Sequence, residues 1–336
     1  MSNIIDMFGL DYEQSRLLFS MQYYLVTKDV EREKDTSVKT KKIQWHNAFR
    51  KNIENMLEIN EAREFAGDND FNLWNEYVLE GAANRIRKAA PTRTPMFLIL
   101  LELVTFIPYY PLGESNDDQY KKLKVVSEDK QKQDTEILAR FLNIEPTYVS
   151  KFLLAYKNAI KGIGGNEYKW IVLVAVIVFA AVAAFLAPTI APLFAAKGLA
   201  GAAAISAGLA ALGGGAIAAG GFGMAGGLAV IVGGGALLGG ATGAAIRGFI
   251  AMSPDFSLSQ AAKIEVVLKE IILAQQDTIK AQELIMEQRK VIYLLEDDIF
   301  KLKLQKAKNQ DEIKKLKKSI GFLKKALNRN EEAVLT

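Results

Sequence analysis

The feature that most constrains this chain is the stretch from residue 170 to residue 246, in which Lys197 is the only charged side chain. We call residues 170–246 the apolar block. A helix needs about 20 apolar residues to cross a bilayer, and the apolar block offers several times that length. Residues 171–187 are rich in Ile, Val, Leu and Phe, whose insertion free energies sum to on the order of −5 kcal/mol at mid-bilayer. We therefore predict a membrane-spanning helix there.

The residues at both ends of the apolar block are typical of a membrane interface. Tyr168, Lys169 and Trp170 precede it and Arg247 follows it, as aromatic and basic anchors do. Basic residues flank both ends, which favours a cytoplasmic location for both termini in a plasma or inner membrane. This implies an even number of passes, and two passes with a glycine-rich hairpin or four short passes remain open. Residues 1–10 lack the basic start and apolar core of a secretory signal.

Small residues recur every fourth position in the second half of the apolar block. They are Gly215, Ala219, Gly223, Gly227, Gly235, Gly239 and Gly243, and Ile231 is the bulky member of the series. On a helix this spacing gives one face of almost bare backbone. Two such faces approach closely and gain dispersion contacts and weak Cα–H hydrogen bonds, so we expect these residues to pack helices together within the membrane.

Residues 198–246 resemble the glycine-zipper segments of membrane-active helical proteins. More loosely, they are similar to the Ala- and Gly-rich hairpin of pore-forming colicins. The resemblance rests on composition and on the four-residue spacing. It implies self-association of close-packed helices in a membrane.

Residues 1–165 predict a soluble helical domain, because apolar residues recur there at helical spacing. One predicted face holds Trp45, Phe49, Ile53 and Met56, and a second runs from Phe71 through Trp74 and Val78 to Ala82. Residues 96–107 are strongly apolar but short, and they contain Glu102. A buried helix is therefore favoured over a membrane span.

Residues 257–328 carry a heptad pattern of isoleucine and leucine that predicts a coiled coil. The predicted core residues are Ile264, Ile271, Ile285, Ile292, Leu295, Ile299, Leu302, Ile313, Leu316, Ile320 and Leu323. A continuous rod would be about 95 Å long, so it needs a partner, and isoleucine at the first core position favours a parallel dimer. Lys306 and Asn309 would form a polar layer that fixes the register. The alternative is an antiparallel hairpin with the amino-terminal helices.

The far end of this region is basic between Lys301 and Arg329. Anionic lipid or nucleic acid could meet such a surface. No aromatic or arginine cluster accompanies the lysines, so solvated outer positions of a coiled coil explain them better, and a nucleic-acid partner is not expected.

Several patterns that could indicate chemistry lack the rest of their motif. The chain has no cysteine. Residues 221–226 match a dinucleotide-binding glycine pattern, but no strand precedes them. Asp68, Asp70 and Asn72 resemble the start of a calcium loop without its glycine. His46, the single histidine, lies beside an apolar face. We therefore expect no enzyme activity, no cofactor and no metal site.

Together these patterns predict an all-α protein in three parts. They are a soluble helical bundle at 1–165, transmembrane Gly/Ala-rich helices at 166–252 and a long coiled-coil helix at 253–336. We expect a self-associating, membrane-permeabilising protein, whose partners are membrane lipid, further copies of the chain and a protein bound by the amino-terminal domain. One alternative is a constitutive membrane-anchored scaffold that recruits another protein through its coiled coil. Another is a soluble oligomer whose glycine-rich helices are buried by the other two parts.

Overall fold

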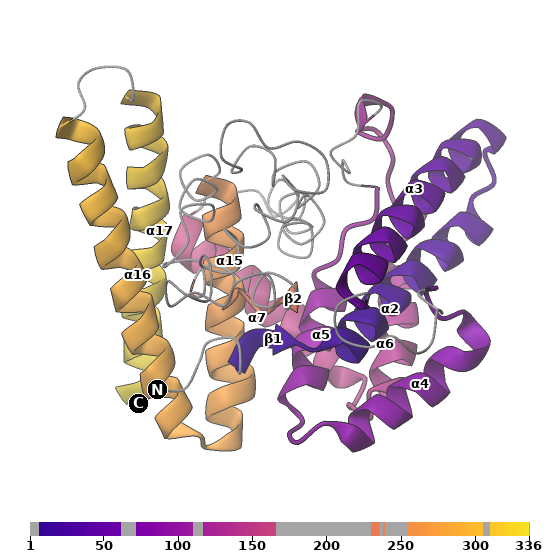
Figure 1. Cartoon of the computed structure of the whole chain (residues 1–336), viewed down its shortest axis with the longest axis horizontal. Helices are drawn as coiled ribbons and strands as arrows, with labels where there is room; N and C mark the ends of the chain where they lie inside the picture. The colour runs from indigo at the N-terminus through magenta and orange to yellow at the C-terminus, as the bar shows by residue number, and fades with distance from the viewer. Residues whose placement is uncertain are drawn as a thin grey trace.

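The computed structural model describes residues 7–61, 72–109, 117–165, 230–235, 238, 254–304 and 310–335. These residues are predominantly helical, which confirms the predicted all-α class. Figure 1 shows the amino-terminal helices on one side, a pair of long carboxy-terminal helices on the other, and α5, α7 and α15 between them. The functional argument below concerns that central layer.

The amino-terminal part begins with a two-residue strand and continues as helices. Its elements are β1 (Gly9–Leu10), α2 (Tyr12–Arg32), α3 (Thr36–Glu61), α4 (Glu76–Ala89), α5 (Thr94–Val104), the 3-10 turn η1 (Asp117–Gln119), α6 (Glu128–Phe141) and α7 (Thr147–Gly164). A capping box starts α2: the Asp11 carboxylate accepts from the Gln14 amide at 2.8 Å, and the Gln14 side chain accepts from the Asp11 amide at 3.3 Å. This fixes the direction in which the chain passes from β1 into α2.

The core of this part follows the predicted stripes in α3 and α5 and departs from them in α4. Trp45, Phe49 and Ile53 are buried, and so is nearly every residue of α5 from Met96 to Leu103. In α4 the predicted Val78 is 48% exposed. Ala82 of the predicted face is buried, and Leu79, Ala83 and Ile86 face the core with it. The helix begins only at Glu76, so Trp74 and Val78 do not continue one helical face.

The carboxy-terminal part is three helices and not one rod. Its elements are α15 (Pro254–Val266), a π-helical turn η4 (Val267–Ile272), a 3-10 turn η5 (Leu273–Gln275), α16 (Thr278–Leu304) and α17 (Gln310–Leu335). The break after η5 has a physical cause: Gln276 is in the left-handed region with φ 59°, and Asp277 caps α16 by accepting from the Lys280 amide at 3.0 Å. The predicted 95 Å rod is therefore wrong.

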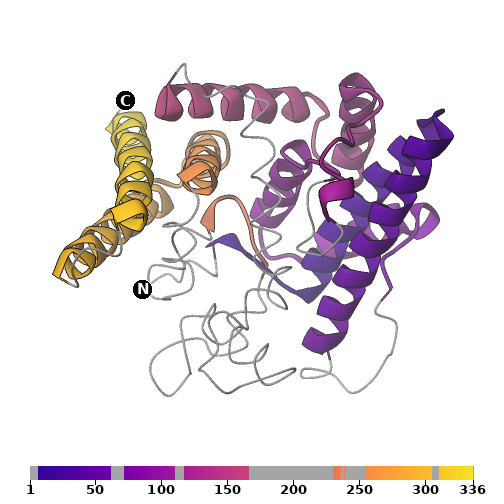
Figure 2. The same ribbon diagram turned by 90° about the horizontal axis from the view of Figure 1, so that it is seen from above.

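Helices α16 and α17 pair within the chain as an antiparallel hairpin (Figures 1 and 2). Lys324 bonds to Glu296 at 2.5 Å and Arg289 bonds to Glu331 at 2.7 Å, so the partner number rises on one helix as it falls on the other. The predicted heptad residues of both helices line this hairpin; Leu295, Ile299, Leu316 and Leu323 are buried. The partner of each helix is thus the other helix of the same chain and not a second copy of the chain. Lys306 and Asn309 lie outside the described residues.

Helices α7 and α15 also pack against each other in opposite directions. Tyr156 donates to Ser259 Oγ at 3.1 Å, and Lys151 bonds to Glu270 at 2.8 Å. The end of α7 at Gly164 and the start of α15 at Pro254 therefore lie at the same end of the pair. The chain between them, which contains the apolar block, therefore begins and ends at neighbouring points of the helical frame.

Candidate functional site

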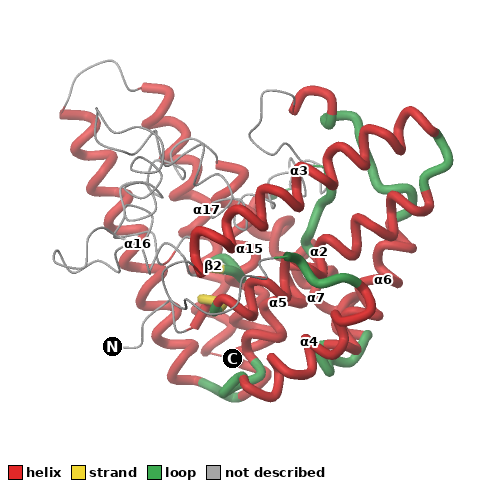
Figure 3. Tube along the Cα trace, turned by 45° about the vertical axis from the view of Figure 1, so that its right-hand side comes forward, coloured by secondary structure: helices red, strands yellow, loops and turns green. Residues whose placement is uncertain are grey.

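One piece of the apolar block, residues 230–235 and 238, is described and lies inside the helical frame. We call it the docked segment. Its strand β2 (Val230–Ile231) pairs antiparallel with β1, Gly9 opposite Ile231 and Leu10 opposite Val230. The Val232 amide extends the pairing by donating to the Phe8 carbonyl at 3.0 Å. Figure 3 shows this two-stranded ladder among the central helices. Val232 and Leu238 are buried in the core.

This differs from the continuous helix expected through the glycine series. Around Ile231 the backbone is a strand followed by a turn, and Gly233 and Gly234 have φ values of 64° and 89°. Gly235 is buried just after the turn. The other predicted helix-packing residues, Gly215, Ala219, Gly223, Gly227, Gly239 and Gly243, lie outside the described residues, so the predicted packing stays a prediction for them.

The turn requires glycine for two independent reasons. Positive φ is costly for residues with a side chain. There is also no space: a Cβ on Gly233 would lie 2.6 Å from Leu98 Cδ2 and 3.0 Å from Val267 Cγ2. A Cβ on Gly234 would lie 2.6 Å from Ile264 Cγ1 and closer still to the Gln260 carbonyl oxygen. The docked segment thus fits flat against α5, η4 and α15.

A buried ion pair holds the turn in place. Glu102 of α5 and Lys263 of α15 meet with Oε2 and Nζ 2.5 Å apart, and the Gly233 amide donates to the other carboxylate oxygen, Oε1, at 2.9 Å. We call these three groups the Glu102 cluster. The side chains of Lys263 and Glu102 are 0% and 3% exposed. Burial lowers the pKa of the Lys263 ammonium, and the Glu102 carboxylate opposes that shift.

The Glu102 cluster connects three segments that are far apart in sequence. Removing one partner of a buried ion pair leaves an uncompensated charge and costs about 3–5 kcal/mol. The Gly233 amide depends on the same carboxylate, so loss of Glu102 would also strand a buried donor. The docked segment, α5 and α15 are therefore coupled through one carboxylate.

Helix α15 is buried on all sides and carries other polar groups. Glu265 accepts from Arg329 of α17 at 2.7 and 2.8 Å and bonds to Lys269 at 2.7 Å. Burial raises the pKa of Glu265, but the two cations outweigh burial and the net pKa lies below its usual value. Gln260 differs: it is fully buried, and neither of its amide atoms has a hydrogen-bond partner among the described residues. An unsatisfied buried amide costs about 1–3 kcal/mol, so the packing of α15 around the docked segment is less stable than a fully hydrogen-bonded arrangement would be.

A cavity of about 440 Å³ lies beside β1, between the amino-terminal helices and the helix break after η5. Its lining includes Leu10 of β1, Thr92 just before α5, Pro95 in the first turn of α5, and Val267 and Lys280 on either side of the helix break. The amino-terminal and carboxy-terminal helices are thus incompletely packed beside β1, although Phe8 and Leu10 are themselves buried in the core.

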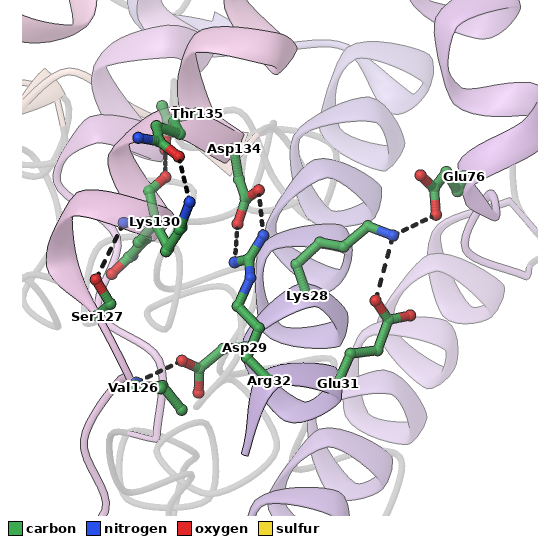
Figure 4. A network of polar contacts seen from close by, with 12 residues as sticks. Lys28, Asp29, Glu31, Arg32, Glu76, Val126, Ser127, Lys130, Asp134 and Thr135 are labelled. Atoms are coloured by element: carbon green, nitrogen blue, oxygen red, sulfur yellow. Dashed lines mark hydrogen bonds and ion pairs between the residues drawn. The ribbon is translucent and has the colours of Figure 1, made fainter. Parts of the chain in front are cut away.

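A second polar network ties the amino-terminal helices to one another (Figure 4). The Asp29 carboxylate accepts from Lys42 at 2.7 Å, from the Tyr109 hydroxyl at 2.5 Å and from the Val126 amide at 2.6 Å. Burial, together with Asp29, raises the pKa of the Tyr109 phenol. All the groups around Asp29 are satisfied by one another, so this network serves to hold helices and loops together.

The ion pairs at the edge of this network join different helices as well. Arg32 of α2 forms a two-pronged pair with Asp134 of α6, and Lys28 bonds to Glu76 of α4 at 2.8 Å (Figure 4). Asp134 lies within α6 and serves this ion pair. Ser127 is the cap and accepts from the Lys130 amide at 3.3 Å.

The single histidine packs as a neutral side chain. The His46 ring stacks on Tyr23 with centroids 4.0 Å apart. Burial is the main reason that its pKa falls to about 4. In the part of the chain that the structure describes, no group of three histidine, aspartate or glutamate side chains is placed to hold a metal ion.

The predicted membrane elements fall largely outside the described residues. This is so for the span at 171–187 and for the anchors Tyr168, Lys169, Trp170 and Arg247. Within the described ranges, no helix combines the length and the apolar character that a membrane crossing requires. Comparisons with protein-family models, curated proteins and solved structures found no match.

Proposed function

We propose that this chain is a self-associating, membrane-permeabilising protein whose helical frame holds the apolar block through the docked segment. The observation that carries the proposal is the Glu102 cluster. A piece of the apolar block lies in the core of the frame and donates its turn amide to a buried carboxylate that is paired with Lys263. Opening this cluster would free the apolar block to enter a plasma or inner membrane.

The path of the chain supports release without unfolding of the frame. Helices α7 and α15 pack antiparallel, so both ends of the intervening chain emerge at the same end of the pair. The described part of the chain between these helices is the docked segment alone. Its withdrawal leaves the pairings of α7 with α15 and of α16 with α17 intact.

The energetics support a held state that is stable but not permanent. The ion pair and the glycine turn favour the docked position, while the buried Gln260 amide, which has no partner among the described residues, opposes it. Residues 198–246 have little intrinsic insertion energy, so several chains would have to associate to hold them in lipid. A trigger needs only to bind the released state better than the held state.

Release of an entrapped dye from vesicles that contain anionic lipid tests the proposal. The full-length protein is compared with Lys263→Met, which loosens the seat, and with Gly223→Leu/Gly227→Leu/Gly239→Leu, which blocks close helix packing. We expect Lys263→Met to release dye at least several-fold faster than the unaltered chain, and the triple variant to release little. Lys315→Met, which removes a surface lysine on α17, is the matched control and should behave like the unaltered chain.

Two results would contradict the proposal. If none of these proteins releases dye across the pH and lipid compositions tried, the chain does not permeabilise membranes. If the proteins bind vesicles without release, and an unrelated anchor replaces residues 170–246 without loss of the cellular phenotype, the chain is a membrane-anchored scaffold.

A further inference from the structure

Helix α16 exposes a row of large apolar side chains that the antiparallel hairpin does not use. The row consists of Ile279, Met286, Tyr293, Phe300 and Leu304, which are between 61% and 70% exposed. The first four are spaced by seven residues. We call this row the α16 stripe. Scattered exposed apolar residues are ordinary, but a heptad-spaced row along one helix is the pattern of a helix-pairing seam.

The α16 stripe lies on the far side of the helix from the hairpin. Successive residues turn by about 100°, so Tyr293 lies roughly 160° from the buried Leu295. Helix α17 packs on the side of Leu295, as the Arg289–Glu331 and Lys324–Glu296 pairs show. The stripe therefore faces away from every described helix.

The charges beside the stripe determine which partner and which direction fit. When a second copy of α16 lies antiparallel with Tyr293 at the two-fold axis, Met286 faces Phe300 of the other copy. Lys290 then comes beside Asp297 of the other copy, and the symmetry repeats the pair. Glu287 likewise comes beside Lys301. A parallel arrangement would put Lys290 against Lys290 and Asp297 against Asp297, which repel.

The same charges bond within one helix in the isolated chain. Lys290 pairs with Glu287 at 3.2 Å and Lys301 pairs with Asp297 at 2.6 Å, all of them partly exposed. Exposed pairs of this kind contribute little, so exchanging them for pairs between two copies costs little. The exchange adds burial of the apolar row.

We propose that the α16 stripe is a self-association surface that binds the α16 stripe of a second copy in an antiparallel, two-fold arrangement centred on Tyr293. This deepens the proposed function, on which it rests, by naming the surface through which the chains meet. The predicted Ile/Leu seam cannot serve, because the hairpin buries it. The association involves α16 alone and adds no contact to α15 or to the docked segment.

Cysteine cross-linking of the full-length protein tests the geometry, because the chain has no cysteine of its own. Single variants Tyr293→Cys, Met286→Cys and Phe300→Cys are oxidised in mild detergent, and Gln282→Cys on the other flank is the control. We expect Tyr293→Cys to form a covalent dimer alone. Met286→Cys and Phe300→Cys should form one efficiently only when mixed with each other. Efficient self-linking of Met286→Cys would indicate a parallel pair, and equal linking at Gln282 would indicate random collision; either result overturns the proposal.

A charge exchange tests the same arrangement without cysteine. Lys290→Glu alone and Asp297→Lys alone should each weaken dimerisation about tenfold or more in sedimentation experiments, since each places like charges together twice. The double variant Lys290→Glu/Asp297→Lys should restore it, and Gln282→Glu should leave it unchanged. Absence of any dimer, or no recovery in the double variant, contradicts the proposed seam.

Dye release by the same variants separates this inference from the proposed function. If dimerisation is lost and dye release persists unchanged, the α16 stripe is not the self-association surface of the active state, although membrane permeabilisation stands. If the antiparallel dimer forms and no variant releases dye, the seam stands and the proposed function fails.

Discussion

Substitution of Lys263 by methionine is the perturbation whose cost follows most directly from the structure. Methionine fills much of the volume of the lysine stem, so the change chiefly removes the charge. The Glu102 carboxylate would then be buried with the Gly233 amide as its remaining described donor. Leaving one member of a buried ion pair uncompensated costs about 3–5 kcal/mol, a large share of the stability of an ordinary domain.

A second substitution separates loss of the pair from loss of packing. In Glu102→Gln/Lys263→Met no charge remains, and the glutamine oxygen still accepts from the Gly233 amide. Its NH2 group is a buried donor that needs an acceptor, whereas the carboxylate oxygen in that place accepted from Lys263, so we expect a residual loss of about 1–2 kcal/mol. The double variant should therefore be more stable than Lys263→Met alone. The non-additivity measures the coupling of the two residues.

Urea unfolding followed by far-UV circular dichroism measures these differences. Lys315→Met removes an exposed lysine and should lie within about 1 kcal/mol of the unaltered chain. If Lys263→Met also lies within 1 kcal/mol, the ion pair does not hold the central layer together. The same conclusion would follow if the loss in the double variant equalled the sum of the losses in Glu102→Gln and Lys263→Met measured separately.

Three further predictions concern other parts of the fold. The pKa of His46 is about 4 in the folded protein and near 6.5 in the unfolded chain, so the unfolded state binds the proton first as the pH falls. The free energy of unfolding should therefore fall by up to about 3 kcal/mol between pH 6.5 and pH 4. His46→Phe should flatten that part of a pH series of urea titrations. Gly234→Ala should destabilise the protein by about 3 kcal/mol in thermal or urea unfolding, because Gly234 has a φ of 89° and an added Cβ would meet Ile264. Gly321→Ala is the control: a Cβ there has open space, so the change should be neutral or slightly stabilising. The pKa of Glu265 is lowered in the folded protein, so its contribution to stability is present above about pH 4.5 and is lost as the pH falls through its folded pKa. Glu265→Gln should therefore lower the free energy of unfolding at pH 7 and reduce its dependence on pH below 4.5. Unchanged acid unfolding would contradict the role of the pair with Arg329.

The sequence was most informative where local pattern and burial agree. The helix at residues 96–107 was predicted to be buried, partly because it contains Glu102, and α5 is buried. The heptad residues of α16 and α17 were identified as a helix-packing seam, and they are one. Periodicity specifies which face is covered, but it does not specify what covers it.

The errors arose where a distant contact or a single backbone break decides the outcome. The partner of Glu102 is Lys263, which local spacing could not supply. The rod is interrupted by two residues: Gln276 in a left-handed conformation and Asp277 as a helix cap. The polar residues from Gln275 to Thr278 were the available signal for this break, and the regular heptad count outweighed it. The exposed α16 stripe was missed because the stronger Ile/Leu series accounted for the same helix.

A disulfide tether of the docked segment tests the central claim most directly. Gly9 and Ile231 face each other across the β1–β2 ladder, at a spacing that suits a disulfide. The protein has no other cysteine, so Gly9→Cys/Ile231→Cys can be oxidised cleanly. We predict that the oxidised protein releases dye from vesicles at least tenfold more slowly than the same protein after reduction, and that neither single-cysteine variant responds to reductant. Equal release by the oxidised and reduced forms would contradict the claim that withdrawal of the docked segment precedes membrane permeabilisation.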